Sequence, residues 1–308
     1  MIQTARPSFP AVALCALLGL AMAGAAQEPV AVFRSDAHLV VLHATVLDPQ
    51  GRRVTDLPAS AFRVLENGVE QQLKVFHRED SPVSIGLIID DSGSMIDKRQ
   101  KVAAAALSLV RASHPDDEVF ILHFNEKAYL DCDFTSDRAK LEQGLAAFDS
   151  RGTTALRDAL RLAIEHLSRH GKEDKKVLVV ITDGEDNCSV IDHDYVVKAA
   201  QQSNVLIYAV GLLTQIDDAR TRLARLELDG LTQATGGKAF YLNDVSETDS
   251  TAREIALEIR DQFTLAYSPS NERLDGTYRK IQVVASGPAS LTVRTRAGYY
   301  STQASAAP

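Results

Sequence analysis

Carboxylate and hydroxyl side chains follow an apolar run in the first third of the chain, and together they could bind a metal ion. The run (VSIGLII) is followed at once by Asp90, Ser92 and Ser94. Such a run predicts a buried strand, and ligand sites in open α/β sheets lie at the carboxyl ends of strands. Oxygen ligands of this kind suit a hard divalent cation such as Mg²⁺. Because D-x-S-x-S is a short motif of common residues, its meaning depends on whether later segments of the chain supply further ligands.

Two later segments offer further oxygen ligands. Residues 152–154 (GTT) open an amphipathic helix, and Asp183 ends a second apolar run, KVLVVITD. Each residue also has an ordinary structural interpretation, since Ser92 and Ser94 could cap the following helix and Asp183 could begin a simple turn. Their joint occurrence after strands of one sheet favours a metal site. Four more acidic residues near this edge are expected to be solvated and to raise the local cation concentration: Asp91, Asp97, Glu185 and Asp186.

On these motifs the segment 82–263 resembles the von Willebrand factor type A (VWA) domain, whose metal-ion-dependent adhesion site uses D-x-S-x-S, then a Thr, then an Asp. The matching positions are Asp90, Ser92, Ser94, Thr154 and Asp183, with Thr153 adjacent to the assigned threonine. The flanks are similar to those of a bacterial group of secreted proteins with this domain between β segments and an Arg-x-Gly-Tyr-Tyr tail, here residues 296–300.

The resemblance implies non-catalytic, metal-dependent protein recognition. Mg²⁺ prefers octahedral oxygen coordination, with Mn²⁺ or Ca²⁺ as alternatives. Three hydroxyls and two carboxylates would leave one coordination position open. Only the two carboxylates would offset the positive charge of the ion. The Asp or Glu of a partner protein could therefore complete the shell. In this family the last helix sometimes shifts between tight and weak binding states.

The middle of the chain alternates strand and helix signals. This alternation predicts an α/β fold with an open, mostly parallel, doubly wound sheet and one antiparallel edge hairpin. The expected strands cover residues 83–90, 118–124, 128–134, 176–183, 204–212 and 238–241. The expected helices cover residues 102–110, 137–148, 154–170, 192–203 (capped by Asp192), 218–234 and 247–263 (capped by Ser246).

Both flanks consist of short strands with turn punctuation and no helix. The expected strands cover residues 38–47, 61–65, 71–76, 264–268, 278–286 and 291–299. Neither flank can bury a sheet face alone, because a lone hairpin is marginal in water. We therefore expect the two flanks to pair into one small β-sandwich-like domain with the α/β domain inserted between them. The domain organisation is then a signal peptide at 1–26, an N-terminal β segment at 31–81, the VWA-like domain at 82–263, a C-terminal β segment at 264–301 and a disordered tail at 302–308.

Composition narrows the classes of function. Residues 1–26 contain Arg6, an apolar stretch and then small residues, the pattern of a cleaved secretory signal, so we expect a secreted or periplasmic protein with no membrane span in its mature form. The formal net charge is −8 and no basic run occurs, which disfavours a nucleic-acid partner. Cys132 and Cys188 remain after processing; a disulfide is permitted, but free, partly buried thiols are favoured.

Parts of the sequence are compatible with three other functions. A serine protease is disfavoured because no G-x-S-x-G elbow occurs and no histidine is placed beside Ser92. Phosphoryl transfer, with Asp90 as acceptor and Mg²⁺ held by Asp91 and Asp183, suits the topology, but no lysine is found at the carboxyl end of a strand and no G-K-[ST] loop occurs. The third is a structural module with an unused metal site, against which the complete ligand set argues.

Overall fold

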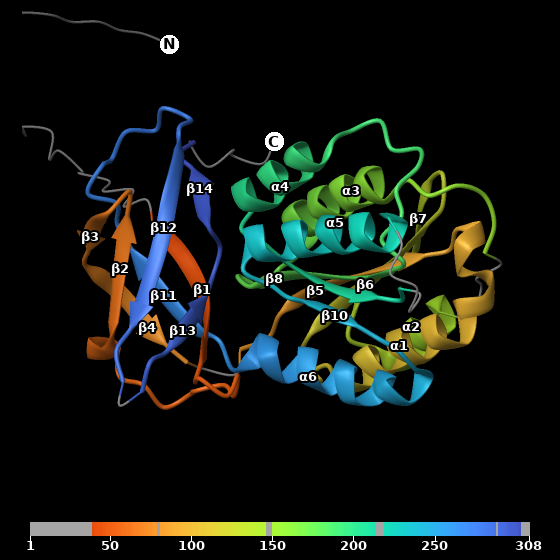
Figure 1. Cartoon of the computed structure of the whole chain (residues 1–308), viewed down its shortest axis with the longest axis horizontal. Helices are drawn as coiled ribbons and strands as arrows, with labels where there is room; N and C mark the ends of the chain where they lie inside the picture. The colour runs from red at the N-terminus through yellow and green to blue at the C-terminus, as the bar shows by residue number, and fades with distance from the viewer. Residues whose placement is uncertain (1–38, 79–80, 146–149, 214–218, 288, 303–308) are drawn as a thin grey trace, which may run out of the picture. The chain divides into compact units, whose positions relative to one another are not determined.

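The computed structural model describes residues 39–78, 81–145, 150–213, 219–287 and 289–302. The expected signal peptide and residues 303–308 of the expected tail lie outside these ranges. The described strands form one six-stranded sheet and two four-stranded sheets (Figure 1).

The six-stranded sheet confirms the predicted doubly wound architecture. Its order is β10-β9-β8-β5-β6-β7, parallel throughout except for the antiparallel pair of β6 and β7 at one edge. The bounds are β5 Ser84–Asp90, β6 Glu118–Phe124, β7 Ala128–Thr135, β8 Lys176–Thr182, β9 Val205–Gly211 and β10 Ala239–Tyr241. Every residue of β5 and β9 is buried, as expected for parallel strands covered on both faces.

Helices cover both faces of this sheet (Figure 1). Successive side chains of β5 point to opposite faces, so Leu87 packs in one hydrophobic cluster with α1 and α6, and Ile88 in another with α3, α4 and α5. The bounds are α1 Arg99–Ala112, α2 Arg138–Gly144, α3 Leu156–His170, α4 His193–Gln202, α5 Ala219–Thr235 and α6 Thr248–Arg260. The described residues also form the short 3₁₀ helices η1 Ala59–Ala61, η2 Gly93–Lys98 and η3 Val245–Glu247.

Gly86 lies at the centre of this sheet, where there is no room for a side chain. A Cβ atom there would come within 2.4 Å of both Leu178 and Phe120 on the neighbouring strands. Glycine thus lets β5 pack closely against β6 and β8, and the predicted ligands Asp90 and Asp183 lie at the carboxyl ends of β5 and β8.

The two flanks pair with each other, as expected. The N-terminal flank supplies β1 Val40–Leu47, β2 Phe62–Glu66, β3 Val69–Gln71 and β4 Leu73–His77. The C-terminal flank supplies β11 Phe263–Tyr267, β12 Tyr278–Ala285, β13 Thr292–Arg294 and β14 Gly298–Tyr300. The sheets have the orders β13-β1-β11-β4 and β14-β12-β2-β3, so each combines strands of both flanks. One hydrophobic cluster joins them, with Leu42 and Leu265 from the first sheet and Val64 and Ile281 from the second.

Two strand predictions in the flanks are wrong in the same way. Residues 71–76 and 291–299 were each expected to form one strand, but each segment is divided between the two sheets. The chain passes from β3 to β4 at Gln72, and from β13 to β14 through residues 295–297. Strands that switch sheets at a corner are a common feature of sandwiches, and local alternation of apolar residues does not reveal the switch.

One of the two predicted helix N-caps is confirmed and the other is wrong. Asp192 caps α4 as predicted, accepting a hydrogen bond from the Tyr195 N–H at 2.8 Å. Ser246 does not cap α6, because η3 precedes that helix and Glu247 occupies the N-cap position. The Asp244 carboxylate instead accepts the Ser246 N–H at 2.8 Å and organises the entry to the helix.

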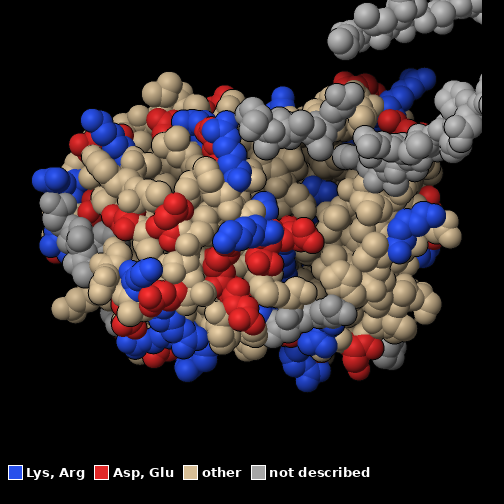
Figure 2. All heavy atoms as spheres, turned by 180° about the vertical axis from the view of Figure 1, so that it is seen from behind, with Lys and Arg blue, Asp and Glu red and all other residues tan. Residues whose placement is uncertain are grey.

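Three further observations bear on the expectations from composition. Within the described part of the chain, no helix is long and apolar enough to cross a membrane. Cys132 and Cys188 are both free, with Cys188 exposed rather than partly buried. On the face shown in Figure 2, acidic and basic side chains lie interspersed.

Candidate metal centre

The loops that carry Asp90 and Asp183 leave the sheet side by side. Strands β5 and β8 are parallel neighbours, paired from Ser84 with Lys176 to Ile89 with Ile181. Asp90, the last residue of β5, therefore lies beside the end of β8 and the following Asp183. The strand order, and not proximity in sequence, brings these two carboxylates to one place.

Asp90 is a buried carboxylate held by hydrogen bonds. Its side chain accepts the Ser92 N–H at 3.0 Å and the Thr182 hydroxyl at 2.6 Å, and the residue is 1% exposed. Burial, followed by the negative charge of Asp183, raises the pKa of Asp90 to about 7, although the bonds from Ser92 and Thr182 act in the opposite direction. A cation beside Asp90 would favour the ionised form of this carboxyl group.

The two serines face each other across the turn that comes after β5. Their hydroxyl oxygens lie 3.1 Å apart, with Ser92 buried and Ser94 exposed. Ser92 occupies the N-cap position of η2, but its side chain makes no capping hydrogen bond. The interpretation of Ser92 as a simple helix cap is therefore wrong.

The loop that carries Thr153 and Thr154 forms hydrogen bonds with the loop after β5 and with the loop after β8. The Gly93 N–H donates to the Gly152 carbonyl at 3.1 Å, and the Thr154 N–H donates to Asn187 Oδ1 at 2.9 Å. Thr154 is buried, whereas Thr153 is exposed and its hydroxyl donates to Cys188 Sγ at 3.2 Å. This difference favours Thr154 over Thr153 as the threonine of the site.

Two of the acidic residues expected to be solvated are not. Asp91 is 2% exposed, and its carboxylate accepts both the N–H and the hydroxyl of Ser150 at 2.8 Å. The Asp186 carboxylate is buried and accepts the N–H and hydroxyl of Ser189 and the N–H of Arg157. Both hold the loops of the site in place. Asp97 is exposed, as expected, and Glu185 is half-buried.

Lys98 is the residue that the sequence interpretation missed. Its ammonium lies 2.7 Å from Asp183 Oδ2, and the carboxylate is only 5% exposed. The expectation that no lysine reaches the carboxyl end of a strand is wrong, because Lys98 belongs to the helical turn after β5 and reaches the end of β8 across the fold. The available signal was the position of Lys98 four residues after Ser94, where a short helical turn folds it back over the loop.

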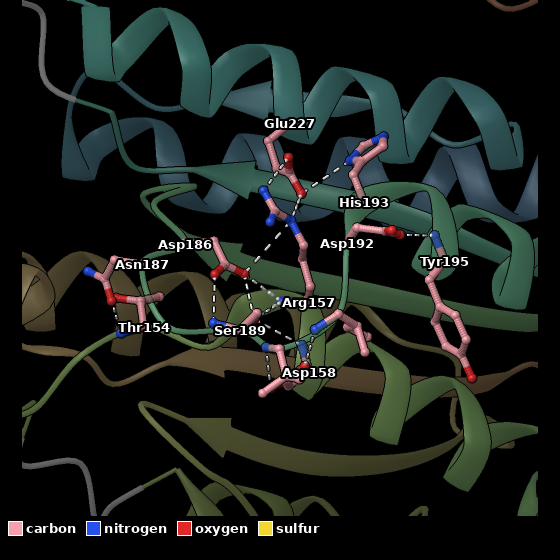
Figure 3. Close-up of polar contacts among 12 residues, drawn as sticks. Thr154, Arg157, Asp158, Asp186, Asn187, Ser189, Asp192, His193, Tyr195 and Glu227 are labelled. Carbon is pink, nitrogen blue, oxygen red and sulfur yellow. Dashed lines mark hydrogen bonds and ion pairs between the residues drawn. The ribbon is translucent and has the colours of Figure 1, made fainter.

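A second polar cluster adjoins the loop after β8. Arg157 donates to both carboxylate oxygens of Glu227, at 2.9 and 3.1 Å, and His193 Nδ1 lies 3.1 Å from the same carboxylate (Figure 3). Burial would raise the pKa of Glu227, but bonding to His193 and Arg157 outweighs it and lowers the pKa to about 2. These three side chains and Asp186 line part of a cavity of about 650 Å³.

The donors of the candidate site suit a hard cation better than a soft one. Within the described ranges, no group of three or more His, Cys, Asp or Glu side chains is placed to hold a metal. The candidate site brings together two carboxylates, and its remaining donors would be hydroxyls. Oxygen-only donor sets of this kind fit Mg²⁺, Mn²⁺ or Ca²⁺.

Comparisons with known proteins identify the family of the segment that carries the candidate site. The family model "von Willebrand factor type A domain" matches residues 84–254. The uncharacterized protein sll0103 of Synechocystis sp. is 25% identical over 183 residues, which are 58% of this chain and 42% of that protein. Calcium-activated chloride channel regulator 1 of Equus caballus is 28% identical over 171 residues, 53% of this chain and 17% of that protein. The chain thus spans less than half the length of these relatives.

A solved structure shows the same fold. The structure described as von Willebrand factor type A from Catenulispora acidiphila superposes with a TM-score of 0.51 at 13% identity, covering 85% of this chain and 73% of that one. Because the family model covers more than half of the sequence and the six-stranded sheet has the corresponding architecture, this chain belongs to the von Willebrand factor type A domain family.

Proposed function

We propose that this protein is a non-catalytic module that recognises a protein partner through a divalent cation. VWA domains commonly serve in protein–protein interaction and adhesion. The observation that carries the proposal is the meeting of two carboxylates, Asp90 and Asp183, with Ser92 and Ser94 at the carboxyl ends of neighbouring strands.

The residues that would hold the ion are Asp90, Ser92, Ser94, Thr154 and Asp183. The ion would be Mg²⁺, with Mn²⁺ or Ca²⁺ as alternatives, and it would supply an electrophilic position for an outside carboxylate. The chain's own residues would leave that position open, so the partner would present an Asp or Glu. We further propose that the protein is exported, with residues 1–26 removed as a signal peptide, and that it meets its partner outside the cytoplasm.

Calorimetric titration with Mg²⁺ tests the metal site. Asp90→Ala and Asp183→Ala should each abolish binding, because each removes one of only two charged donors, while circular dichroism should show a retained fold. Asp97→Ala is the matched control, since Asp97 is a nearby acidic residue that is exposed. Unchanged Mg²⁺ affinity in either site variant would contradict the proposal.

Partner recognition needs a separate experiment. The protein, immobilised, should retain a partner from the native envelope fraction in the presence of Mg²⁺ and release it when a chelator is added. The Asp90→Ala variant should retain none under either condition. A partner held equally with and without chelator would show that recognition does not depend on the metal.

One observation favours a second candidate, Mg²⁺-dependent phosphoryl transfer with Asp90 as acceptor: the structure places the Lys98 ammonium next to Asp183, at the carboxyl end of the sheet. Against it, Asp90 is 1% exposed and both its carboxylate oxygens already accept hydrogen bonds. Incubation with acetyl phosphate and Mg²⁺ separates the two candidates, since a recognition module binds the ion without turnover.

A further inference from the structure

The ion pair between Lys98 and Asp183 lies inside the candidate metal centre. Lys98 is the last residue of η2, the turn that carries Ser94, and its side chain is 20% exposed. Its ammonium donates to Asp183 Oδ2 at 2.7 Å. Among the described residues, the other oxygen, Oδ1, has a single long contact of 3.4 Å with the Glu185 N–H. The lysine is therefore the principal partner of this buried carboxylate.

An ammonium group, like a bound metal cation, is positively charged and is stabilised by oxygen acceptors. It is a compact point charge on a flexible four-carbon stem, with three donors that seek oxygen acceptors. A divalent ion at this site would require the same Asp183 carboxylate. Two cations near one carboxylate repel each other, and the repulsion is strong where little water screens it.

We propose that Lys98 is an internal competitor for the cation at this site, and that a divalent ion binds only when the Lys98 ammonium leaves Asp183 for solvent. Lys98 thereby sets the metal affinity and the cation concentration at which the module becomes competent to bind its partner. This inference rests on the proposed function, because it assumes that Asp183 is a metal ligand.

A merely structural ion pair would behave differently. It would contribute to the stability of the loop, and its removal would lower the melting temperature without changing the affinity for Mg²⁺. A competitor must change that affinity. The variant Lys98→Met keeps the length of the side chain and removes its charge, so it separates these two roles.

Calorimetric titration with Mg²⁺ on the full chain is the first test. The Kd of Lys98→Met should be about 10-fold lower than that of the wild type, the effect of removing one partly buried positive charge. The matched control is Lys101→Met, whose ammonium is exposed and contacts the Asn243 carbonyl instead of a site carboxylate, and whose Kd should stay unchanged.

Amine-selective labelling followed by mass spectrometry is the second test. Mg²⁺ should increase the labelling rate of Lys98 several-fold in the wild type, because the ion releases its ammonium to solvent, and should leave the rate of Lys101 unchanged. In Asp90→Ala the rate for Lys98 should not respond to Mg²⁺.

The outcomes separate this inference from the proposed function. Suppose that the wild type binds Mg²⁺ and that this binding depends on Asp90. If Lys98→Met then has the same Kd, or if Mg²⁺ does not change the labelling rate of Lys98, then Lys98 is not a competitor and the metal site stands. If neither the wild type nor Lys98→Met binds Mg²⁺, both the inference and the proposed function are overturned.

Discussion

The serine hydroxyls at the end of β5 contribute differently from the carboxylates beside them. Ser92 and Ser94 are neutral donors 3.1 Å apart, whereas Asp90 carries the charge that would offset a divalent ion. A carboxylate gains far more electrostatic energy from a cation than a hydroxyl does. Replacing a carboxylate at the site should therefore weaken Mg²⁺ binding more than replacing a hydroxyl, whichever of the two side chains is more buried.

We predict that Ser92→Ala and Ser94→Ala each weaken Mg²⁺ binding less than Asp90→Ala does. The expected loss is about 10-fold in Kd for each serine, equivalent to one hydrogen-bond-sized contribution. Titration calorimetry on the three variants under one buffer condition measures the order. Serine variants as severe as Asp90→Ala would show that hydroxyl coordination, and not charge, dominates the site.

At the scale of elements, three helices meet at one charged junction. Arg157 near the start of α3, His193 at the start of α4 and Glu227 in α5 hold these helices together above the loop that comes after β8 (Figure 3). Hydrogen bonding to Glu227 raises the pKa of His193 above 6.5; burial and the charge of Arg157 oppose this shift, and Asp194 adds to it.

The junction should lose stability as the pH rises. Since the folded-state pKa of His193 is raised, its contribution is complete below the unfolded-state value of about 6.5 and is lost as the pH passes through the folded-state value. Glu227, with a pKa of about 2, stays ionised throughout. The difference in melting temperature between the wild type and His193→Gln should be larger at about pH 5.5 than at about pH 8.5.

The variant Glu227→Gln supplies the control for that experiment. Without the carboxylate, His193 loses its anionic partner, and the effect of His193→Gln should become nearly independent of pH. An equal difference in melting temperature at both pH values in the wild-type background would show that the imidazole does not gain from Glu227.

At the scale of the whole molecule, a buried polar cluster joins the two flanks of the α/β domain. Glu66 in β2 accepts hydrogen bonds from Tyr267 in β11 at 2.8 Å, from Arg279 in β12 at 3.0 Å and from Tyr299 in β14 at 2.9 Å. Arg279 also donates to the carbonyls of two residues in the connection that precedes its own strand. The cluster thus fastens the N-terminal flank to three strands of the C-terminal one.

Arg279→Met should destabilise the protein by about 3 kcal/mol, because it leaves the buried charge of Glu66 without its cation. Urea denaturation followed by circular dichroism measures the change. The exposed ion pair of Arg63 with Glu70 is the matched control, and Arg63→Met should leave the midpoint unchanged. A negligible effect of Arg279→Met would contradict this prediction.

We propose that segments 31–81 and 264–301 form one domain into which segment 82–263 is inserted. Limited proteolysis should then leave the N-terminal and C-terminal pieces associated, because each four-stranded sheet contains strands from both. Size-exclusion chromatography of the digest, followed by mass spectrometry, detects the association. Flank pieces that separate freely from a folded core would contradict the proposal.

The amino-acid sequence alone determined the central sheet and the candidate ligands. The buried runs of β5, β8 and β9 are long, apolar and bounded by polar loops, so local pattern was sufficient to identify them. Asp90 and Asp183 were found because each directly follows such a run, and the ends of parallel strands meet at one edge of a sheet.

Only the tertiary structure decided which side chains surround those ligands. The ion pair of Lys98 with Asp183 joins positions 85 residues apart, and the hydrogen bond of Thr182 to Asp90 joins positions 92 apart. The division of residues 71–76 and 291–299 between two sheets also depends on distant partners. Local pattern specifies what a segment can become, whereas contacts between segments that are distant in sequence determine the charge balance of the site.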